Sequence, residues 1–401
     1  MIDSVAFQSV LSFLDAGLAD FSGWQILVYT LIVTHVTIAG VTIYLHRSQA
    51  HRALDLHPIV SHFFRFWLWL TTGMVTREWV AIHRKHHARC ETPDDPHSPQ
   101  TRGIRKVLFE GAELYRAEAK NRETIEKFSH GTPDDWIERN LYTRHSALGV
   151  SLLLILNVAL FGVIGLTVWA VQMLWIPVNA AGIINGIGHY WGYRNWDSAD
   201  ASTNVFPIGI LIGGEELHNN HHAYGSSAKF SSKWYEFDIG WLYIRILSAL
   251  GLATVRRLAP TPKFAAAKPA VDQETLHAVI QHRYDVMAQF AVSVRRACAE
   301  EARRLSRPQG RLLASARSWL AVDAAKWTAD QRAKLGEIFA ASEQVKKIVE
   351  MRNELSAIWD RSTLSREQLV VMLQQWCHRA EASGVRALQD IALRMRCYAA
   401  A

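Results

Sequence analysis

The chain alternates between long apolar runs and charged segments. Residues 24–45 form a run of twenty-two residues without a charged side chain. At about 1.5 Å per residue, a helix of that length crosses the ~30 Å hydrocarbon core of a bilayer. A second uncharged run, residues 148–191, is about twice as long, which predicts two spans joined by a tight turn around residues 162–169. These runs predict an integral membrane protein.

A third apolar segment, residues 59–80, contains His62, Arg65, Arg77 and Glu78. Ionisable side chains are poorly suited to lipid-facing positions in the hydrocarbon, whereas the many aromatic residues of this segment suit the membrane boundary. We therefore expect the segment to lie in the interface, or to dip into the membrane and return.

Basic residues are absent before Arg47 and cluster in 84–144, 194–257 and the C-terminal part of the chain. By the positive-inside rule these segments face the cytoplasm. The prediction is an all-α integral membrane protein with three or four transmembrane helices, the preferred topology being three crossings with the N-terminus outside. The start of the chain has no basic region or small-residue cleavage site, so we expect no removable signal peptide.

Shorter segments add to this fold. Residues 236–257 fit an interfacial helix, residues 104–140 fit a charged helical cap on the cytosolic side, and residues 4–19 form a further short helix of undetermined place. After the prolines at 260 and 262 the pattern becomes that of soluble helices, with apolar residues at helical spacing in 315–358 and 366–398. We predict an N-terminal segment (1–23), a membrane domain (24–258) and a helical cytosolic C-terminal extension (259–401).

The net charge of +7 belongs to the C-terminal extension, since residues 1–262 are balanced. Such a surplus can bind anionic lipid headgroups or an acidic partner, and it is equally typical of an ordinary solvated helical surface. The four cysteines show no CxxC spacing and read as reduced cytosolic thiols. Cys90 lies three residues after a histidine cluster, where we interpret it as a bystander.

The candidate chemistry lies in histidines at the ends of the apolar segments. The motifs are HRSQAH, HRKHH, NGIGH and HNNHH. In each HxxHH the three imidazoles share one helix face and can converge on one small volume. Imidazole is the commonest side-chain metal ligand. The candidate residues are His46, His51, His83, His86, His87, Asn185, His189, His218, His221 and His222.

Nine imidazoles exceed what a single four- to six-coordinate metal uses, so the count indicates a two-metal site. Imidazole suits iron, copper, zinc and nickel. A dinuclear site at the membrane face, beside apolar spans that can enclose a hydrocarbon, favours iron, because attack on an unactivated alkyl chain requires a strong oxidant derived from O2. If all clusters serve one site, they must lie on one side of the membrane.

These motifs, with the connecting residues ETPDDPHS, GYR and GGEE, resemble the membrane fatty-acyl desaturases related to stearoyl-CoA desaturase. The resemblance runs from about residue 24 to 258, and details around HRKHH are most similar to bacterial desaturases of acyl chains esterified in lipids. It implies a di-iron enzyme that uses O2 and two electrons to form a cis double bond, usually Δ9, in acyl-CoA or phospholipid. It also implies that the nine histidines bind two iron ions (Fe2+/Fe3+) and that Asn185 contacts one iron through water.

The resemblance implies partners and a location as well. No haem-type HPGG segment is present, so electrons must come from a separate donor such as a ferredoxin or a flavin or iron–sulfur reductase. We expect the bacterial inner membrane, with the metal site and C-terminus cytoplasmic, and no nucleic-acid partner. The end of the chain, WCHRAEASGVRALQDIALRMR, resembles the C-terminal part of certain insertion-element transposases. That family's catalytic carboxylate set is missing from the sequence, so we interpret the segment as recruited scaffold.

Two alternatives stay open. A hydroxylase of the same metal architecture also begins with hydrogen abstraction, so the histidine motifs do not separate it from a desaturase. A non-enzymatic membrane protein, such as a haem cytochrome or a metal carrier, is the second. A cytochrome needs facing axial histidines within its spans, and a carrier needs polar groups at mid-membrane; the spans here offer few beyond His35 and Asn157.

Overall fold

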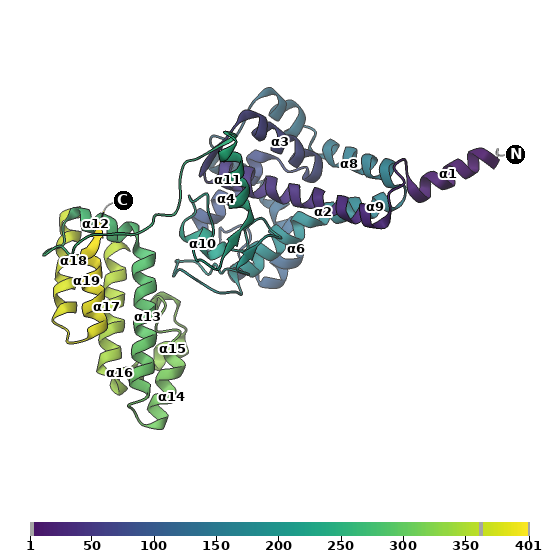
Figure 1. Cartoon of the computed structure of the whole chain (residues 1–401). Coiled ribbons are helices and arrows are strands. Elements are labelled where there is room, and N and C mark those ends of the chain that lie inside the picture. Colours follow the sequence, from purple (N-terminus) through teal and green to yellow (C-terminus); the bar gives the residue numbers. More distant parts are fainter. Residues whose placement is uncertain (1–3, 361–363, 400–401) are drawn as a thin grey trace. The chain divides into compact units, whose positions relative to one another are not determined.

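The computed structural model describes residues 4–360 and 364–399, and the chain forms two compact units (Figure 1). The first unit comprises Met1–Arg194 and Asp200–Ala259, and the second Asn195–Ala199 and Pro260–Ala401. The described elements are mostly helical, in agreement with the predicted all-α class.

Two continuous helices of the first unit are long and apolar enough to cross a membrane, Gly23–Ala50 and Ile164–His189. Gly23–Ala50 consists of α2 (Gly23–Ala39) and the π-helix η1 (Gly40–Ala50). A capping box begins it: the Ser22 hydroxyl accepts from the Gln25 backbone N–H, and the Gln25 side chain accepts from that of Ser22. The second consists of three elements, α9 (Ile164–Ile176), η3 (Pro177–Ile184) and η4 (Ile187–His189).

A shorter apolar helix, α8 (Ser146–Phe161), packs against α9 across a turn at Gly162. Gly162 has a φ of +65°, and a Cβ there would lie 2.4 Å from the carbonyl oxygen of Leu14, so the turn requires glycine. It lies at the start of the predicted range. The Asn157 amide donates to Gln172 Oε1 (2.8 Å) and the Tyr29 hydroxyl donates to Asn157 Oδ1 (2.9 Å), which joins α2, α8 and α9.

The segment expected at the membrane boundary is broken into two helices, α3 (Pro58–Thr72) and α4 (Thr76–Arg89). The break is at Gly73, whose φ of +64° ends α3 in a left-handed cap. Arg65 is buried, where it pairs with Asp135 (2.7 Å) and Glu138 (2.9 Å), so the segment's charge is directed into the protein. The segment is therefore not one continuous span.

The remaining elements of the first unit are short and connect or cover the long helices. The helices are α1 (Ser4–Ala16), α5 (Pro99–Arg102), α6 (Ile104–Ala119), α7 (Arg122–Phe128), η2 (Glu138–Thr143), α10 (His218–Ala223) and α11 (Ile239–Ala249). Two strand pairs hold the loops: β1 (Leu54–Leu56) runs antiparallel to β4 (Ala253–Val255), and β2 (Ile208–Gly209) parallel to β3 (Phe237–Asp238). Residues 236–257, expected as one interfacial helix, thus end in a strand.

The second unit is a bundle of helices. They are α12 (Gln273–Gln281), α13 (Arg283–Ala302), α14 (Arg307–Ala316), η5 (Ala324–Lys326), α15 (Ala329–Ala333), α16 (Leu335–Ala341), α17 (Glu343–Asp360), α18 (Arg366–Glu381) and α19 (Arg386–Cys397). Strand β5 (Lys263–Phe264) pairs with β6 (Tyr398–Ala399), so the two ends of the bundle meet.

The bundle has its own apolar core, in which Phe290, Leu373 and Trp376 are buried. The Trp376 indole N–H donates to the carbonyl of Met351 (2.8 Å), so its one polar atom is satisfied. The predicted helical pattern of 315–358 is wrong in its first part: α14 ends at Ala316, and Leu320 and Ala321 are buried in an irregular segment. Leu320 and Ala321 are therefore buried by packing into the core of the bundle, and not because they recur on one face of a helix.

Candidate metal centre

The structure gathers the nine predicted histidines into two groups. The first, here called site A, consists of His46, His51, His83, His87 and His221. The second, site B, consists of His86, His189, His218 and His222. Within each group the possible ligand atoms all lie within 4.8 Å of one another. Each group is therefore compact enough to surround one metal ion.

The π-helix η1 explains the HxxxxH spacing. A π-helix closes i→i+5 hydrogen bonds, and the His51 N–H donates to the His46 carbonyl at 3.1 Å. The two imidazoles thus lie on the same face, with ring centroids 5.0 Å apart. On an α-helix a spacing of five would turn them further apart. The sequence did not indicate a π-helix here.

Each HxxHH motif is divided between the two sites, so the expectation that a trio converges on one volume is wrong. From α4, His83 and His87 belong to site A and His86 to site B. From α10 the order is reversed, since His218 and His222 belong to site B and His221 to site A. Residues four apart lie on one helical stripe, and the third histidine is offset toward the neighbouring site.

The Nε2 atoms face one another in both sites. In site A, Nε2 of His221 lies 3.0 Å from Nε2 of His46 and 2.9 Å from that of His87, and Nε2 of His51 lies 2.8 Å from that of His83. In site B the corresponding distances from His189 are 3.1 Å to His86 and 3.0 Å to His218. So many converging imidazole nitrogens are best satisfied by a cation among them.

Burial holds five of the imidazoles in the neutral form, which can bind a metal ion. It lowers the pKa of His51, His83, His87, His218 and His221 well below that of free imidazole, and the neighbouring imidazoles lower it further. The Nε2 atom of His222 is buried and has no hydrogen-bond partner among the described residues. The donor set therefore fits first-row metal ions.

Carboxylates contact four of the nine imidazole rings through the nitrogen opposite Nε2, which is Nδ1; two of these carboxylates (Asp95 and Glu215) are buried and two (Glu91 and Asp200) are half-buried. Glu215 accepts from His46 at 2.7 Å in site A. In site B, Asp95 accepts from His86 (3.0 Å), Glu91 from His189 (3.3 Å) and Asp200 from His222 (3.0 Å). A carboxylate on Nδ1–H leaves the Nε2 lone pair directed at the metal and makes it more basic.

The lowered pKa values of Asp95 and Glu215 keep these two carboxylates charged, which is consistent with that role. Burial raises the pKa of Asp95, but the contact with His86 outweighs it and brings the pKa to about 2. In the same way His46 holds the pKa of the buried Glu215 below its usual range. Sequence reasoning noted the ETPDDPHS and GGEE segments without assigning these residues a role. The sequence signal that could have identified these partners is an acidic residue shortly before or after a histidine motif.

Further side chains support site A. Trp79 stacks on His83 with ring centroids 4.9 Å apart, and Phe230 packs against His221 at 4.7 Å. Arg47, fully buried, donates to both carboxylate oxygens of Asp238 and lies 3.7 Å above the Phe230 ring. A guanidinium with two carboxylate contacts is geometrically restrained. It therefore anchors the end of η1, next to His46, to the start of α11.

Three other residues of the first unit, outside the two histidine groups, are Asn185, His97 and Cys90. Asn185 is half-buried at the end of η3 and belongs to neither histidine group. His97 packs on His86, with ring centroids 4.4 Å apart. Cys90, interpreted as a bystander, lies with its Sγ 3.9 Å from Nε2 of His86, and burial raises its pKa so that it stays a thiol. It therefore borders site B directly.

Two parts of the chain match known protein families. Residues 22–236 match the model of a family described as fatty acid desaturase, and residues 265–400 match one described as transposase. Delta-9 acyl-lipid desaturase 1 of Arabidopsis thaliana is 30% identical over 234 residues, which are 58% of this chain and 75% of that protein. The sn-1 stearoyl-lipid 9-desaturase of Anabaena variabilis is 30% identical over 226 residues (55% and 79%). An acyl-CoA 5-desaturase of Anemone leveillei is 32% identical over 234 residues (54% and 67%).

Proposed function

Since the chain belongs to the fatty acid desaturase family and is thus an oxidoreductase, we propose that it is a di-iron enzyme that uses O2 to introduce a cis double bond, at Δ9, into acyl chains of membrane lipids. The observation that carries the proposal is the division of nine histidines into two compact groups, with four of their rings contacted at Nδ1 by buried or half-buried carboxylates. Two irons held there would supply, with O2, the oxidising power for removing hydrogen from an unactivated alkyl carbon.

In this proposal the histidines, Asn185 and the carboxylates have separate roles. The histidines of site A would hold one iron and those of site B the other, and Asn185 would contact one iron through water, as the resemblance implies. The carboxylates Glu91, Asp95, Asp200 and Glu215 keep the ring orientation. Site B has four histidines against five in site A, so site B offers the more open coordination.

The choice of substrate rests on the relatives. Two of the similar proteins are named for acyl-lipid or stearoyl-lipid substrates and position 9, whereas the Anemone relative is named for acyl-CoA and position 5. We propose an acyl-lipid substrate, with acyl-CoA as the alternative. Electrons would come from a separate ferredoxin or a flavin or iron–sulfur reductase.

We further propose that the first unit is embedded in the bacterial inner membrane in three crossings, with the metal centre and the C-terminal extension (259–401) in the cytoplasm. The two long apolar helices support two of these crossings, and the apolar α8 supports the third. The similarity of residues 265–400 to a transposase model is proposed to reflect recruited scaffold without transposase activity.

The test is lipid analysis after expression in a host that lacks its own desaturase. Acyl chains lighter by two mass units would support desaturation, and chains heavier by sixteen would support the hydroxylase alternative. Locating the double bond and the glycerol carbon that carries the chain tests Δ9 and the acyl-lipid substrate. Activity of a preparation that contains zinc and no iron would refute the di-iron proposal.

Variants with one histidine of each site replaced test whether desaturation depends on both sites. We expect His86→Ala (site B) and His221→Ala (site A) each to abolish desaturation while the protein still fractionates with membranes. His130→Ala, an exposed histidine outside both groups, is the matched control and should retain activity. Desaturation by either site variant would contradict the assignment of ligands.

A further inference from the structure

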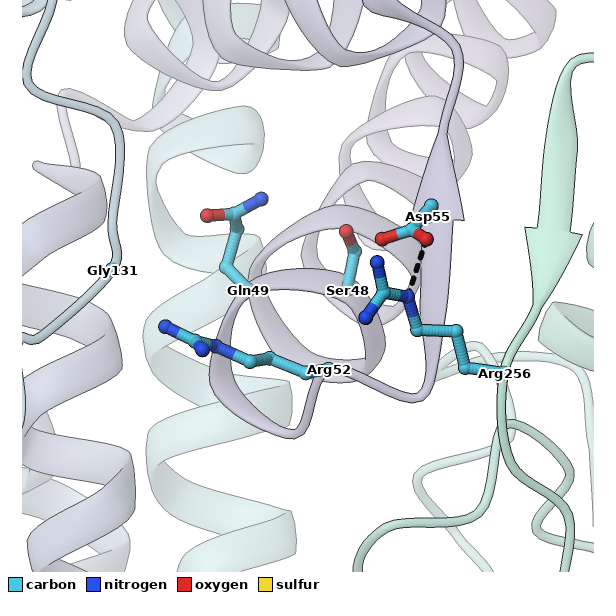
Figure 2. Close-up of a pocket in the computed structure, with 6 residues that line it drawn as sticks. All are labelled: Ser48, Gln49, Arg52, Asp55, Gly131 and Arg256. Atoms are coloured by element: carbon cyan, nitrogen blue, oxygen red, sulfur yellow. Dashed lines mark hydrogen bonds and ion pairs between the residues drawn. The ribbon is translucent and has the colours of Figure 1, made fainter.

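A polar pocket of about 290 Å³ opens on the first unit, beside the end of η1 (Figure 2). Its lining contains two arginines and one carboxylate, and none of the nine histidines. Figure 2 shows Arg52 extended toward Gly131 on one side, and Arg256 paired with Asp55 on the other, with two neutral hydrogen-bonding side chains between them. The lining residues are Ser48, Gln49, Arg52, Asp55, Gly131 and Arg256.

Arg52 is held in an unusual conformation. Its φ is +50°, in the left-handed region that non-glycine residues rarely adopt. Its guanidinium donates to the carbonyl of His130 at 3.2 Å and lies so close to Gly131 that a Cβ there would be 1.6 Å from Nη2. Backbone conformations of this kind persist where the surroundings enforce them, and they concentrate at functional sites.

Arg84 adds a third positive charge behind the pocket wall. It donates to the carbonyls of Gln49 (2.8 Å) and Ala50 (2.9 Å) at the end of η1, and to those of Phe128 (3.0 Å) and His130 (2.8 Å). It thereby holds the two walls together. Burial lowers the pKa of Arg84, and the charge of Arg52 lowers it further, which shows how close the cationic groups are.

Asp55 only partly balances these charges. It pairs with Arg256 across the β1–β4 strands, and both side chains are more than half exposed. Three guanidiniums against one carboxylate leave the pocket with a positive field. The guanidinium fork matches phosphate geometry, and the Ser48 hydroxyl and Gln49 amide can add neutral donors.

The strand pair that carries Asp55 also leads to exposed apolar side chains at its other end. Strand β1 leads directly into α3 and strand β4 follows α11, and the His57 N–H donates to the carbonyl of Leu252 at 2.9 Å where they meet. Next to this junction Ile59 is 70% exposed and Leu250 is 67% exposed. A cationic pocket beside exposed apolar side chains is the arrangement that suits a headgroup with acyl chains attached.

We propose that this pocket binds the phosphate of a bilayer phospholipid headgroup and so holds the end of the first long apolar helix at the membrane surface. The proposal rests on the membrane embedding proposed above. It concerns a bound lipid apart from the metal centre, since no histidine of either site lines the pocket.

The experiment uses the full chain purified in neutral detergent, with bound lipid counted by native mass spectrometry. The probes are dioleoyl phosphatidylglycerol, dioleoylglycerol with the same chains and no phosphate, and inorganic phosphate. We expect the phospholipid to be retained, the diacylglycerol to be lost, and inorganic phosphate to compete only weakly. Inorganic phosphate binding as tightly as the lipid would overturn the assignment to a lipid, as would equal retention of both lipids.

Variants at exposed positions give effects of opposite sign. Arg256→Gln should weaken phosphatidylglycerol binding on the order of tenfold, the effect of one charged hydrogen-bonding group, and Arg52→Gln should do the same. Asp55→Asn should strengthen binding, because it removes the competing carboxylate. If the Asp55–Arg256 pair served only to join the strands, both variants would leave lipid binding unchanged, and that result would overturn the proposal.

Arg139→Gln is the matched control, since Arg139 is an exposed arginine paired with Asp134 (3.3 Å) and does not line the pocket. It should bind lipid as the unaltered chain does; a loss equal to that of Arg256→Gln would overturn the proposal. Carbonate extraction of membranes tests the embedding separately. A chain that resists extraction and yet shows no dependence of lipid binding on Arg256 would refute this pocket alone, whereas a chain released by carbonate would refute the embedding.

Discussion

Replacing Glu215 by Gln should weaken iron binding at site A without disturbing site B. Glu215 is buried, and its Oε1 atom accepts from His46 Nδ1 (2.7 Å) and from the Thr42 hydroxyl (2.7 Å). Gln keeps the size of the side chain and a carbonyl acceptor, and removes the negative charge. The change therefore probes the charge on Nδ1–H rather than the packing.

The expected size follows from this contact. A buried hydrogen bond to a charged group contributes about 1.5–3 kcal/mol, against about 1 kcal/mol for a neutral one. The difference, about 0.5–2 kcal/mol, corresponds to a roughly two- to thirtyfold weaker affinity, and its upper part is of the order usual for outer partners of metal-binding histidines. We expect roughly tenfold for site A.

The assay is iron per protein, measured by mass spectrometry of the metal after dialysis against graded chelator. The unaltered chain should retain iron at both sites over a range in which Glu215→Gln loses one equivalent. Glu216→Gln is the control, because the adjacent Glu216 is also buried but accepts from the backbone N–H groups of Ile212 (2.8 Å) and Gly214 (3.1 Å). Wild-type iron affinity in Glu215→Gln, or equal loss in both variants, would refute the reasoning.

Three further predictions follow from the same structure. Asp200→Asn should weaken iron binding at site B about tenfold, because Asp200 contacts Nδ1 of His222. The double variant with Glu215→Gln should release both iron equivalents in the chelator assay. Release of a single equivalent would count against two separate sites. Arg47→Met leaves Asp238 buried without its ion pair and should lower the free energy of unfolding by about 3–5 kcal/mol, measured by denaturant titration in detergent; Asp238→Asn in the same background should recover part of the loss. Gly162→Ala should destabilise the α8–α9 turn by more than about 1 kcal/mol, because its φ is positive and its Cβ would meet the Leu14 carbonyl. Gly336→Ala is the comparison: Gly336 is exposed within α16, and no atom lies within 4 Å of the added Cβ, so this variant should not lower the temperature of thermal unfolding and should raise it slightly.

The helical class and the candidate ligands could be predicted from the sequence because both depend on local pattern. A charge-free run of twenty-two residues specifies a long apolar helix, and 44 uncharged residues around Gly162 specify two helices with a turn. The nine histidines stood out by spacing and number. Their connecting residues carried the resemblance to desaturases, which the family match confirms.

Other features depend on contacts between distant residues. The break at Gly73 was not predicted, because left-handed glycine geometry and the approach of the Ser146 carbonyl are properties of the packed chain. Likewise, Leu320 and Ala321 are buried outside a helix, so the apolar spacing of residues 315–358 predicted a helix that the structure does not form at these two residues. In both cases tertiary packing, rather than local propensity, decided the local structure.

The two histidine groups show most clearly which features the sequence determines and which depend on tertiary packing. The sequence by itself determined which imidazoles are available and that they are too many for one metal ion. Only the tertiary structure decided how they are shared: η1 became a π-helix that aligns His46 with His51, and α4 and α10 each sent two histidines to one site and one to the other. It also brought Glu215 to His46 over a separation of 169 residues. Spacing along one helix specifies a face, whereas a coordination sphere is specified by where several faces meet, and that depends on the packing of the whole unit.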